Sequence, residues 1–256
     1  MFKLQILKNF IMATRNIALR NYSPKVKSLT IGDKLILYGD EASPPVRFVQ
    51  MTASILGIVL DFRTVDLFSG ENKTEFYKNI NPLQKVPCLM THDEVLADSQ
   101  AIGLYLCRRW DTEHVLYPPG DLEQARCDEI LFYNATTLFP IDSDIYTKFF
   151  AGIPASKERI EDWLKALDFL ENRLKDHTWL AGDRMMLADI CAVATISTML
   201  CLIPLADHHV KLRHWFNEIE QQPFFNINKR GLERLTKFIT AVRVGRFQPG
   251  INLDQN

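Results

Sequence analysis

The spacing of apolar residues changes repeatedly along the first 110 residues, which predicts short strands alternating with helices. Residues 59–65 alternate as in a half-buried strand, whereas Val46, Val49 and Ala53 recur at helical spacing. The serine and two prolines at 43–45 are suited to opening that helix. The expected elements are strands at 34–38, 59–65, 87–90 and 95–97, helices at 43–57 and 99–110, and a short helix or irregular segment at 70–79.

Everything after residue 120 is predicted to be helical. A linker is expected at 111–120, where Pro118, Pro119 and Gly120 are clustered. Pro140 should bend the first long helix, and the segment 187–203 is apolar on almost every side, as in the central helix of a second domain. The expected helices are 121–152, a segment around 160–174, 187–203, 210–222 and 231–241, with 242–256 as a frayed tail.

The charge of the chain is nearly balanced but unevenly distributed. Six of the 30 basic residues and none of the 31 acidic residues lie in residues 1–32, so the remainder carries a net charge of −7. An acidic body argues against nucleic-acid binding, which needs a concentrated basic face. No apolar run approaches the ~20 residues of a membrane span. Residues 1–33 are expected to form a basic, disordered extension, and a mitochondrial presequence is the alternative.

The cysteines favour a reducing compartment. The five are odd in number, contain no C-x-x-C pair and stand among apolar residues, which is typical of reduced core cysteines. The protein is therefore expected to be cytoplasmic, or mitochondrial if the basic segment is a presequence.

Ser43 is the candidate catalytic residue. A serine here is most simply a helix N-cap, but a helix N-terminus also stabilises an anion. Only the thiolate form of a thiol is a good nucleophile, and each unit by which its pKa falls corresponds to about 1.4 kcal/mol. One hydroxyl hydrogen bond and the helix end can together supply that much. Ser43 is therefore predicted to donate to a substrate thiolate and to stay protonated itself.

Val86-Pro87 and Asp98-Ser99 form a second group of candidates, at a strand entrance and a helix start. A cis bond before Pro87 would turn the Val86 backbone outward to bind an extended peptide, whereas a trans bond would make it an ordinary strand start. Asp98 and Ser99 could bind the charged end of a peptide or serve only as a cap. Their order and spacing, followed by an all-helical half, favour the binding interpretation.

With these motifs, residues 34–240 resemble the cytosolic glutathione S-transferases, of the serine type found in the theta-like, delta and epsilon classes. The resemblance implies an α/β thioredoxin-like N-terminal domain at 34–111 and an all-α C-terminal substrate domain at 121–241. It also implies a thiol-activating Ser43, glutathione as co-substrate, no metal and a homodimer. The residues that it assigns to glutathione are Gln84, Lys85, Val86, Pro87, Asp98, Ser99 and Gln100.

Two positions depart from the family pattern. Insect delta and epsilon members usually have a histidine where this chain has Gln84, which can donate a hydrogen bond to the glycyl carboxylate of glutathione but carries no charge. Met186 stands where the family has a serine or threonine that caps the helix containing Asp189. Loss of such a cap costs about 0.5–2 kcal/mol. The first departure concerns glutathione affinity and the second concerns stability.

Asp142 lies in the middle of an apolar stripe on the helix after the linker. A buried carboxylate is costly unless it is partnered, so Asp142 could form a salt bridge or reach solvent at the bend near Pro140. The functional alternative is a single polar anchor in a hydrophobic pocket. Such an anchor would accept a hydrogen bond from the hydroxyl of a rigid apolar molecule, such as a sterol.

Four short segments are similar to the Noppera-bo type of insect epsilon-class transferases, which act in ecdysteroid biosynthesis and hold a steroid hydroxyl on an aspartate. These segments are 40–47, 65–70, 142–144 and 195–198. The resemblance matches Asp142 to that aspartate and implies a steroid or other apolar small molecule as the second ligand. The other pocket positions that it implies are Leu67, Phe139, Ser143, Tyr146 and Thr198.

Three functions are compatible with these observations. The leading one is a glutathione transferase of steroid hormone synthesis, and the alternatives are a general detoxifying transferase for electrophilic xenobiotics and a non-catalytic sterol carrier. His208 and His209 are expected to be surface helix residues, because no cysteine or acidic partner stands at metal-ligand spacing. The basic residues of 229–234 are expected to form a solvated face.

Overall fold

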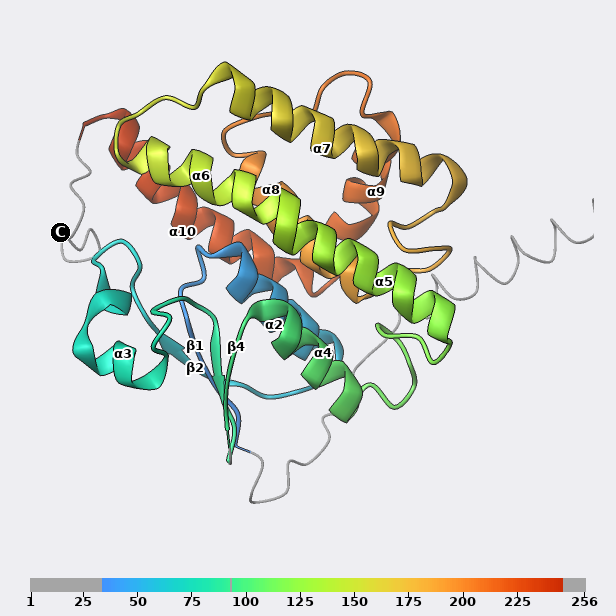
Figure 1. Ribbon diagram of the computed structural model, residues 1–256, viewed down its shortest axis with the longest axis horizontal. Coiled ribbons are helices and arrows are strands. Elements are labelled where there is room, and N and C mark those ends of the chain that lie inside the picture. The colour runs from blue at the N-terminus through green and yellow to red at the C-terminus, as the bar shows by residue number, and fades with distance from the viewer. Residues whose placement is uncertain (1–33, 93, 246–256) are drawn as a thin grey trace, which may run out of the picture.

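The computed structural model describes residues 34–92 and 94–245; the basic extension expected at 1–33 lies outside them, so the alternatives for that segment stay predictions. A small α/β domain packs against a larger group of helices (Figure 1). The strands are β1 (Ile36–Gly39), β2 (Asp61–Thr64), β3 (Cys88–Met90) and β4 (Val95–Ala97).

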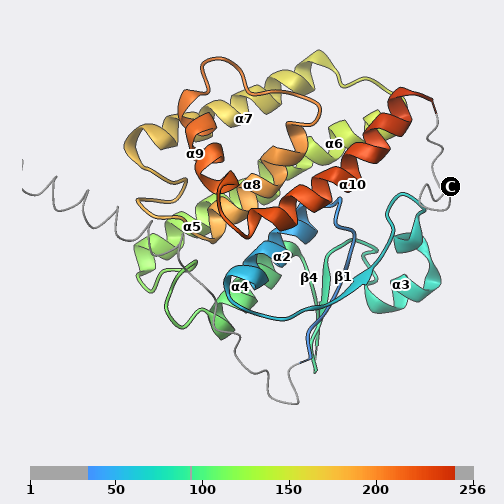
Figure 2. The same ribbon diagram turned by 180° about the vertical axis from the view of Figure 1, so that it is seen from behind.

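The sheet has the order β2-β1-β3-β4, in which β1 and β2 are parallel and the other pairs are antiparallel. Helices α2 (Pro44–Ile55) and α4 (Ser99–Trp110) cover the face that looks toward the helical domain. The short helix α3 (Glu75–Ile80), preceded by the 3-10 turn η1 (Glu71–Lys73), lies on the other side of the sheet (Figures 1 and 2). The thioredoxin-like order predicted from the apolar pattern is confirmed.

The register of the sheet brings the candidate residues to one edge. Cys88 of β3 pairs with Tyr38 of β1 on one side and with Ala97 of β4 on the other. Because β1 and β4 both run antiparallel to β3, the residues that follow them emerge beside those that precede β3. The segments 40–43, 84–87 and 98–100 therefore meet. Parallel pairing of β2 with β1 brings residues 65–70 to the same edge.

The second domain is entirely helical, as predicted. Its central helix is buried at every position, in agreement with its uniformly apolar sequence. The last helix begins six residues before the predicted start at 231, because Phe225 and Asn228 already face the core. The helices are α5 (Asp121–Tyr133), α6 (Phe139–Phe150), α7 (Lys157–Asp176), α8 (Leu187–Met199), α9 (Val210–Glu220) and α10 (Phe225–Arg243).

The disturbance expected at Pro140 takes the form of a π-helical turn, η2 (Asn134–Leu138), between α5 and α6. The two helices follow one path across the molecule (Figure 1). Proline has no N–H to donate to the carbonyl one turn earlier, and a wider turn accommodates the missing hydrogen bond without ending the helix. The turn lies directly before the residues of α6 that were predicted to form a pocket.

One hydrophobic core extends through both domains. The same cluster of contacting apolar side chains contains Leu37 of the sheet, Val46 of α2 and Trp163 of α7. The α/β domain is therefore fastened to the helices by burial of apolar surface as well as by the chain connection. In the part of the chain that the structure describes, no helix is long and apolar enough to cross a membrane.

Candidate active site

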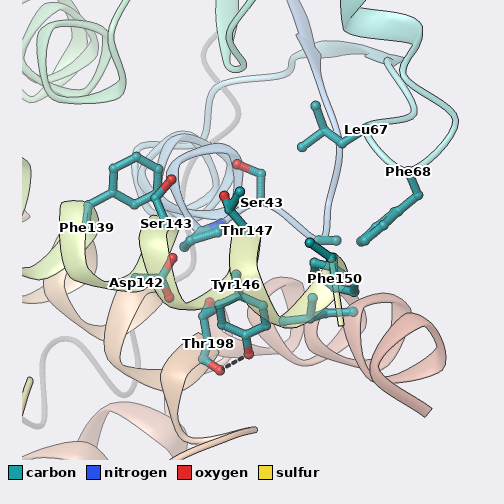
Figure 3. Close-up of a pocket in the computed structure, with 14 residues that line it drawn as sticks. Ser43, Leu67, Phe68, Phe139, Asp142, Ser143, Tyr146, Thr147, Phe150 and Thr198 are labelled. Atoms are coloured by element: carbon teal, nitrogen blue, oxygen red, sulfur yellow. Dashed lines mark hydrogen bonds between the residues drawn. The ribbon is translucent and has the colours of Figure 1, made fainter. Parts of the chain in front are cut away.

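A cavity of about 440 Å³ lies between the sheet edge and the helices α6, α8 and α10 (Figure 3). Its volume is in the range of small-molecule pockets, and most of its lining is apolar. Residues that the sequence pattern did not indicate, among them Phe68, Phe150 and Leu235, complete the walls. The positions singled out from the sequence that line the cavity are Ser43, Leu67, Phe139, Asp142, Ser143, Tyr146 and Thr198.

Helix α6 turns two different faces to its surroundings. The residues that line the cavity recur at three and four positions from Phe139 to Phe150, whereas Ile141 and Ile145 are buried in the protein core. The apolar stripe predicted around Asp142 does not distinguish these two faces. A one-dimensional pattern cannot separate a core from an apolar cavity, because both exclude water.

Ser43 occupies the N-cap position of α2 with extended backbone angles, but its hydroxyl makes no capping hydrogen bond. A capping side chain normally bonds the N–H of the second or third helical residue. Here the second is Pro45, which has no N–H, and the N–H of Val46 donates to the Ser43 carbonyl at 3.1 Å. The Ser43 side chain therefore remains available at the cavity wall, where it is 8% exposed (Figure 3).

Asp142 is 3% exposed, and neither of the two structural alternatives drawn from the sequence, a salt bridge or access to solvent, describes it. It does not reach solvent, and among the described residues no basic nitrogen comes within 4.0 Å of it. Its Oδ1 is buried without a hydrogen-bond partner in this part of the chain. Burial raises the pKa of Asp142 to about 8, against the opposing attraction of the Arg47 charge. At neutral pH the carboxyl group is thus mostly protonated and can donate as well as accept a hydrogen bond.

Arg47 is a fully buried positive charge behind the cavity, and in the sequence it is recognisable only as a charged residue inside an apolar helix. Its Nε donates to Asn228 Oδ1 at 2.8 Å, and its Nη1 donates to the Ala42 carbonyl at 3.0 Å. Its Nη2 donates to the hydroxyl of Thr198 and to a backbone carbonyl of α8. Burial lowers its pKa to about 10, so it stays charged at neutral pH.

Two other polar side chains of the cavity, Tyr146 and Thr198, form hydrogen bonds within the protein. The Tyr146 hydroxyl donates to the Thr198 carbonyl at 2.6 Å, as the dashed line in Figure 3 marks. The Thr198 hydroxyl donates to the Ala194 carbonyl at 2.8 Å. Among the buried polar atoms of the described residues that line the cavity, Asp142 Oδ1 is the one without a hydrogen-bond partner.

The strand entrance has the geometry that the peptide-binding interpretation requires. The Val86–Pro87 bond is cis, and Val86 precedes the first paired residue of β3. The carbonyl of Lys85 accepts hydrogen bonds from the Tyr77 hydroxyl and the Asn81 side chain, both at 2.8 Å. Buried donors thus hold the segment in position.

Gln84 has a positive φ of 53°, and its side chain is turned toward the carbonyl of Lys73, to which it donates at 3.3 Å. Its own carbonyl accepts from Asn72 at 2.9 Å. The amide that was expected to reach the glycyl carboxylate of glutathione thus has a partner within the protein. This contact is long and partly exposed, so a ligand carboxylate can compete for the amide.

Asp98 and Ser99 both make hydrogen bonds at the start of α4. One carboxylate oxygen of Asp98 accepts from the N–H groups of Gln100 and Ala101, which is the cap foreseen as the plain alternative. Ser99 is buried and donates to the Gln100 side chain at 3.0 Å. Gln100 in turn donates to the Cys191 sulfur of α8 at 3.7 Å. The exposed Asp98 is therefore the member of this group most open to a ligand.

His209 is not a surface residue, which corrects the prediction made for the histidine pair. It is completely buried, while His208 is exposed, and both contact Oδ1 of Asp168 from α7, at 2.9 and 2.7 Å. The N–H of Ala206 donates to Nδ1 of His209, which places a ring proton on Nε2, the nitrogen that faces Asp168. A metal would need the lone pair of that nitrogen, and the arrangement favours a hydrogen bond from His209 to Asp168.

The prediction of a solvated basic face at 229–234 is wrong for one member. The side chain of Arg234 is only 19% exposed and forms ion pairs with Asp40 and Asp66, at 2.8 and 3.2 Å. Both carboxylates follow strands of the sheet and lie more than 160 residues away in sequence. A local charge pattern cannot reveal such partners.

Comparison with known proteins agrees with this geometry. Residues 37–114 match the glutathione S-transferase N-terminal domain family, and residues 145–223 match the glutathione S-transferase C-terminal domain family. The chain is 34% identical over 192 residues to glutathione S-transferase 1 of Manduca sexta, covering 73% of this chain and 88% of that protein.

Solved structures with the same fold include an epsilon-class glutathione S-transferase from the housefly Musca domestica, with a TM-score of 0.78, 28% identity, and coverage of 82% of this chain and 98% of that one. A glutathione transferase homologue from Drosophila mojavensis, solved with bound glutathione, has a TM-score of 0.77, 32% identity, and coverage of 84% and 99%. The chain therefore belongs to the glutathione S-transferase family, and it is a transferase that uses glutathione as its co-substrate.

Proposed function

We propose that Ser43 activates glutathione and that the adjoining cavity binds a steroid-like second ligand through Asp142. The observation that carries this proposal is the buried carboxyl oxygen of Asp142, which has no hydrogen-bond partner among the described residues, in the apolar cavity that Ser43 also lines. The Ser43 hydroxyl at the α2 N-terminus, which makes no capping hydrogen bond, supports a thiolate beside it. The tripeptide would lie along the sheet edge, with its backbone on Val86 and its γ-glutamyl end near Asp98.

The second ligand is a rigid apolar molecule with one polar group. A mostly apolar cavity of about 440 Å³ suits such a molecule better than a polar one, because the part of the chain that the structure describes leaves a buried oxygen of Asp142 without a partner there. The resemblance of 40–47, 65–70, 142–144 and 195–198 to the Noppera-bo type supports a role in ecdysteroid biosynthesis. The class of chemistry is thiolate attack on an electrophilic carbon or a glutathione-assisted isomerisation or reduction.

The first test measures the ionisation of bound glutathione. We expect the pKa of its thiol in the complex to lie at least about one unit below its ordinary value near 8.5. Ser43→Ala should restore roughly one unit and reduce turnover of a generic aromatic halide at neutral pH by about tenfold or more. Titration of the ultraviolet absorbance of the thiolate gives the pKa, and Ser143→Ala serves as the control for loss of a cavity serine. A thiol that is still protonated at neutral pH in the wild-type complex would refute the activating role.

The second test measures steroid affinity with and without the carboxyl group. Asp142→Ala should weaken binding of a hydroxylated steroid about tenfold, which corresponds to about 1.4 kcal/mol, and should leave its deoxy analogue unaffected or bound more tightly. Asp144→Ala on the same helix is the matched control, because that side chain pairs with Lys148 and Arg159 instead.

The same assays separate the alternatives. Equal steroid affinity in Asp142→Ala and wild-type protein would favour a general detoxifying transferase. Tight glutathione and steroid binding without turnover of any electrophile would favour a sterol carrier. We also propose a homodimer, as the family resemblance implies, and sedimentation equilibrium at micromolar concentration should give twice the mass of the chain.

A further inference from the structure

We propose that Arg234 is a positioning residue that holds the loop at 65–70 against α10 and thereby sets the shape of the cavity for the second substrate. The inference rests on the proposed function, because it takes the cavity to be the second-substrate site. Arg234 does not line the cavity, and it acts through the residues that do.

One guanidinium group joins two carboxylates that come from different loops. Arg234 Nε donates to Asp40 Oδ1 at 2.8 Å, and Nη2 donates to Asp40 Oδ2 at 3.3 Å and to Asp66 Oδ1 at 3.2 Å. Asp40 is completely buried, and Asp66 is nearly so. We call these three residues the clasp. The planar guanidinium of Arg234 can form hydrogen bonds with both carboxylates at once in a fixed geometry, which a lysine ammonium cannot reproduce.

The two carboxylates of the clasp also hold the backbone of the cavity wall. Asp40 Oδ2 accepts from the N–H of Leu67 at 3.1 Å, and Asp66 Oδ1 accepts from the N–H of Phe68 at 2.9 Å. Without Arg234 these two acids would face each other as like charges with little solvent between them. The position of Leu67 and Phe68 thus depends on a cation supplied by the last helix of the other domain.

Aromatic contacts link the clasp to the residues that line the cavity. Phe68 stacks on Phe238 of α10, with ring centroids 3.4 Å apart and planes 10° apart. The guanidinium carbon of Arg234 lies 5.9 Å from the Phe68 ring centroid and 5.3 Å from that of Phe238. Phe68 also meets Phe150 edge-on at 5.3 Å, and both of these rings line the cavity. Cation–π attraction and stacking therefore fix the position of the Phe68 ring, which closes this wall of the cavity.

The loop that holds Ser43 is also fixed by other hydrogen bonds. Removal of Arg234 should therefore affect mainly the apolar cavity. The Ser43 N–H donates to the Asp40 carbonyl at 2.9 Å, and Arg47 donates to the Ala42 carbonyl. Neither bond involves the guanidinium of Arg234. Glutathione activation should consequently survive its removal.

The test compares Arg234→Met with Arg230→Met, which removes an exposed arginine from the same helix. We expect Arg234→Met to bind a neutral apolar fluorescent probe, Nile red, at least fivefold more weakly, with the KM for glutathione within twofold of wild type. Amide hydrogen exchange at residues 66–69 should accelerate in the same variant only. Arg234→Lys, which keeps the charge without the fork, should be intermediate in both readouts and serves if the methionine variant fails to fold.

A double-mutant cycle links the effect to the clasp. Asp66→Asn keeps an acceptor for the loop N–H groups but removes the charge, and we expect its effect on probe affinity to be absent once Arg234 is methionine. Probe affinity of Arg234→Met equal to that of Arg230→Met, or an equal loss of glutathione affinity, would overturn the inference. A wild-type protein that binds no apolar probe would instead overturn the proposed pocket, and this inference with it.

Discussion

At the residue scale, Asp142 shows how a cavity differs from a core. Its carboxyl group has a pKa of about 8 because burial disfavours the charged form more than the nearby Arg47 favours it. Its sequence pattern indicated a polar residue on an apolar face but not its protonation. A mostly neutral carboxyl group costs less to bury than a carboxylate, which explains how the fold tolerates it without a salt bridge.

This protonation has a measurable effect on stability. Between the ordinary pKa near 3.8 and the folded-state value of about 8, the unfolded chain has lost a proton that the folded protein retains. The free energy of unfolding should therefore fall as pH rises across this window, by up to about 1.4 kcal/mol per pH unit from this group. Urea unfolding of wild type and Asp142→Asn should be measured from pH 4.5 to 8.5. The free energy of unfolding of the variant, relative to that of wild type, should increase as pH rises. A constant difference between the two proteins would contradict the raised pKa.

At the scale of an element, helix α8 compensates for the capping hydroxyl that Met186 lacks. Met186 makes no side-chain cap, but its N–H donates to Asp189 Oδ2 at 2.8 Å. Asp189 Oδ1 also accepts from the N–H of Leu180 at 3.0 Å and from the Trp215 indole at 2.8 Å. Asp189 is thus a buried acid in the first turn of α8, and its partners extend to two other segments.

Asp189→Ala should lower the free energy of unfolding by about 3 kcal/mol or more, because three donors in the protein interior would lose their acceptor. Asp121→Ala at the exposed start of α5 is the control, and it should cost only a few tenths of a kcal/mol. Thermal or urea unfolding followed by circular dichroism measures both. A loss for Asp189→Ala no larger than that for Asp121→Ala would contradict the role of this acid as a shared acceptor.

At the scale of the whole molecule, the two domains are tightly packed where α10 meets the loop that leads to Ser43. A Cβ added to Gly231 of α10 would lie 2.2 Å from the Glu41 carbonyl oxygen and 2.3 Å from Arg47 Cδ. One of these is backbone of the loop that leads to Ser43, so it cannot move aside as the end of a flexible side chain can. The closeness of α10 to this loop is what allows Arg47 to reach Asn228 and Arg234 to reach Asp40.

Gly231→Ala should therefore reduce both stability and transferase activity. Overpacking of this kind costs about 1–3 kcal/mol, and displacement of the 41–43 loop should raise the pKa of the bound glutathione thiol. Gly120→Ala is the matched control, since the added Cβ there would make only an ordinary contact at 3.6 Å. Equal unfolding midpoints for the two variants would show that α10 can move away from the 41–43 loop without loss of stability.

The sequence alone determined the order of strands and helices, the opening of α2 at Ser43 and the all-helical second half, because these depend on spacing and capping within a few residues. The family resemblance added pocket positions that all line one cavity. Tertiary structure decided what these residues can do. Arg47, His209 and Arg234 each have a partner far away in sequence, at 181, 41 and 194 residues, and burial by distant segments sets the charge of Asp142. Charge pairing and desolvation act through space, so only the folded chain reveals them.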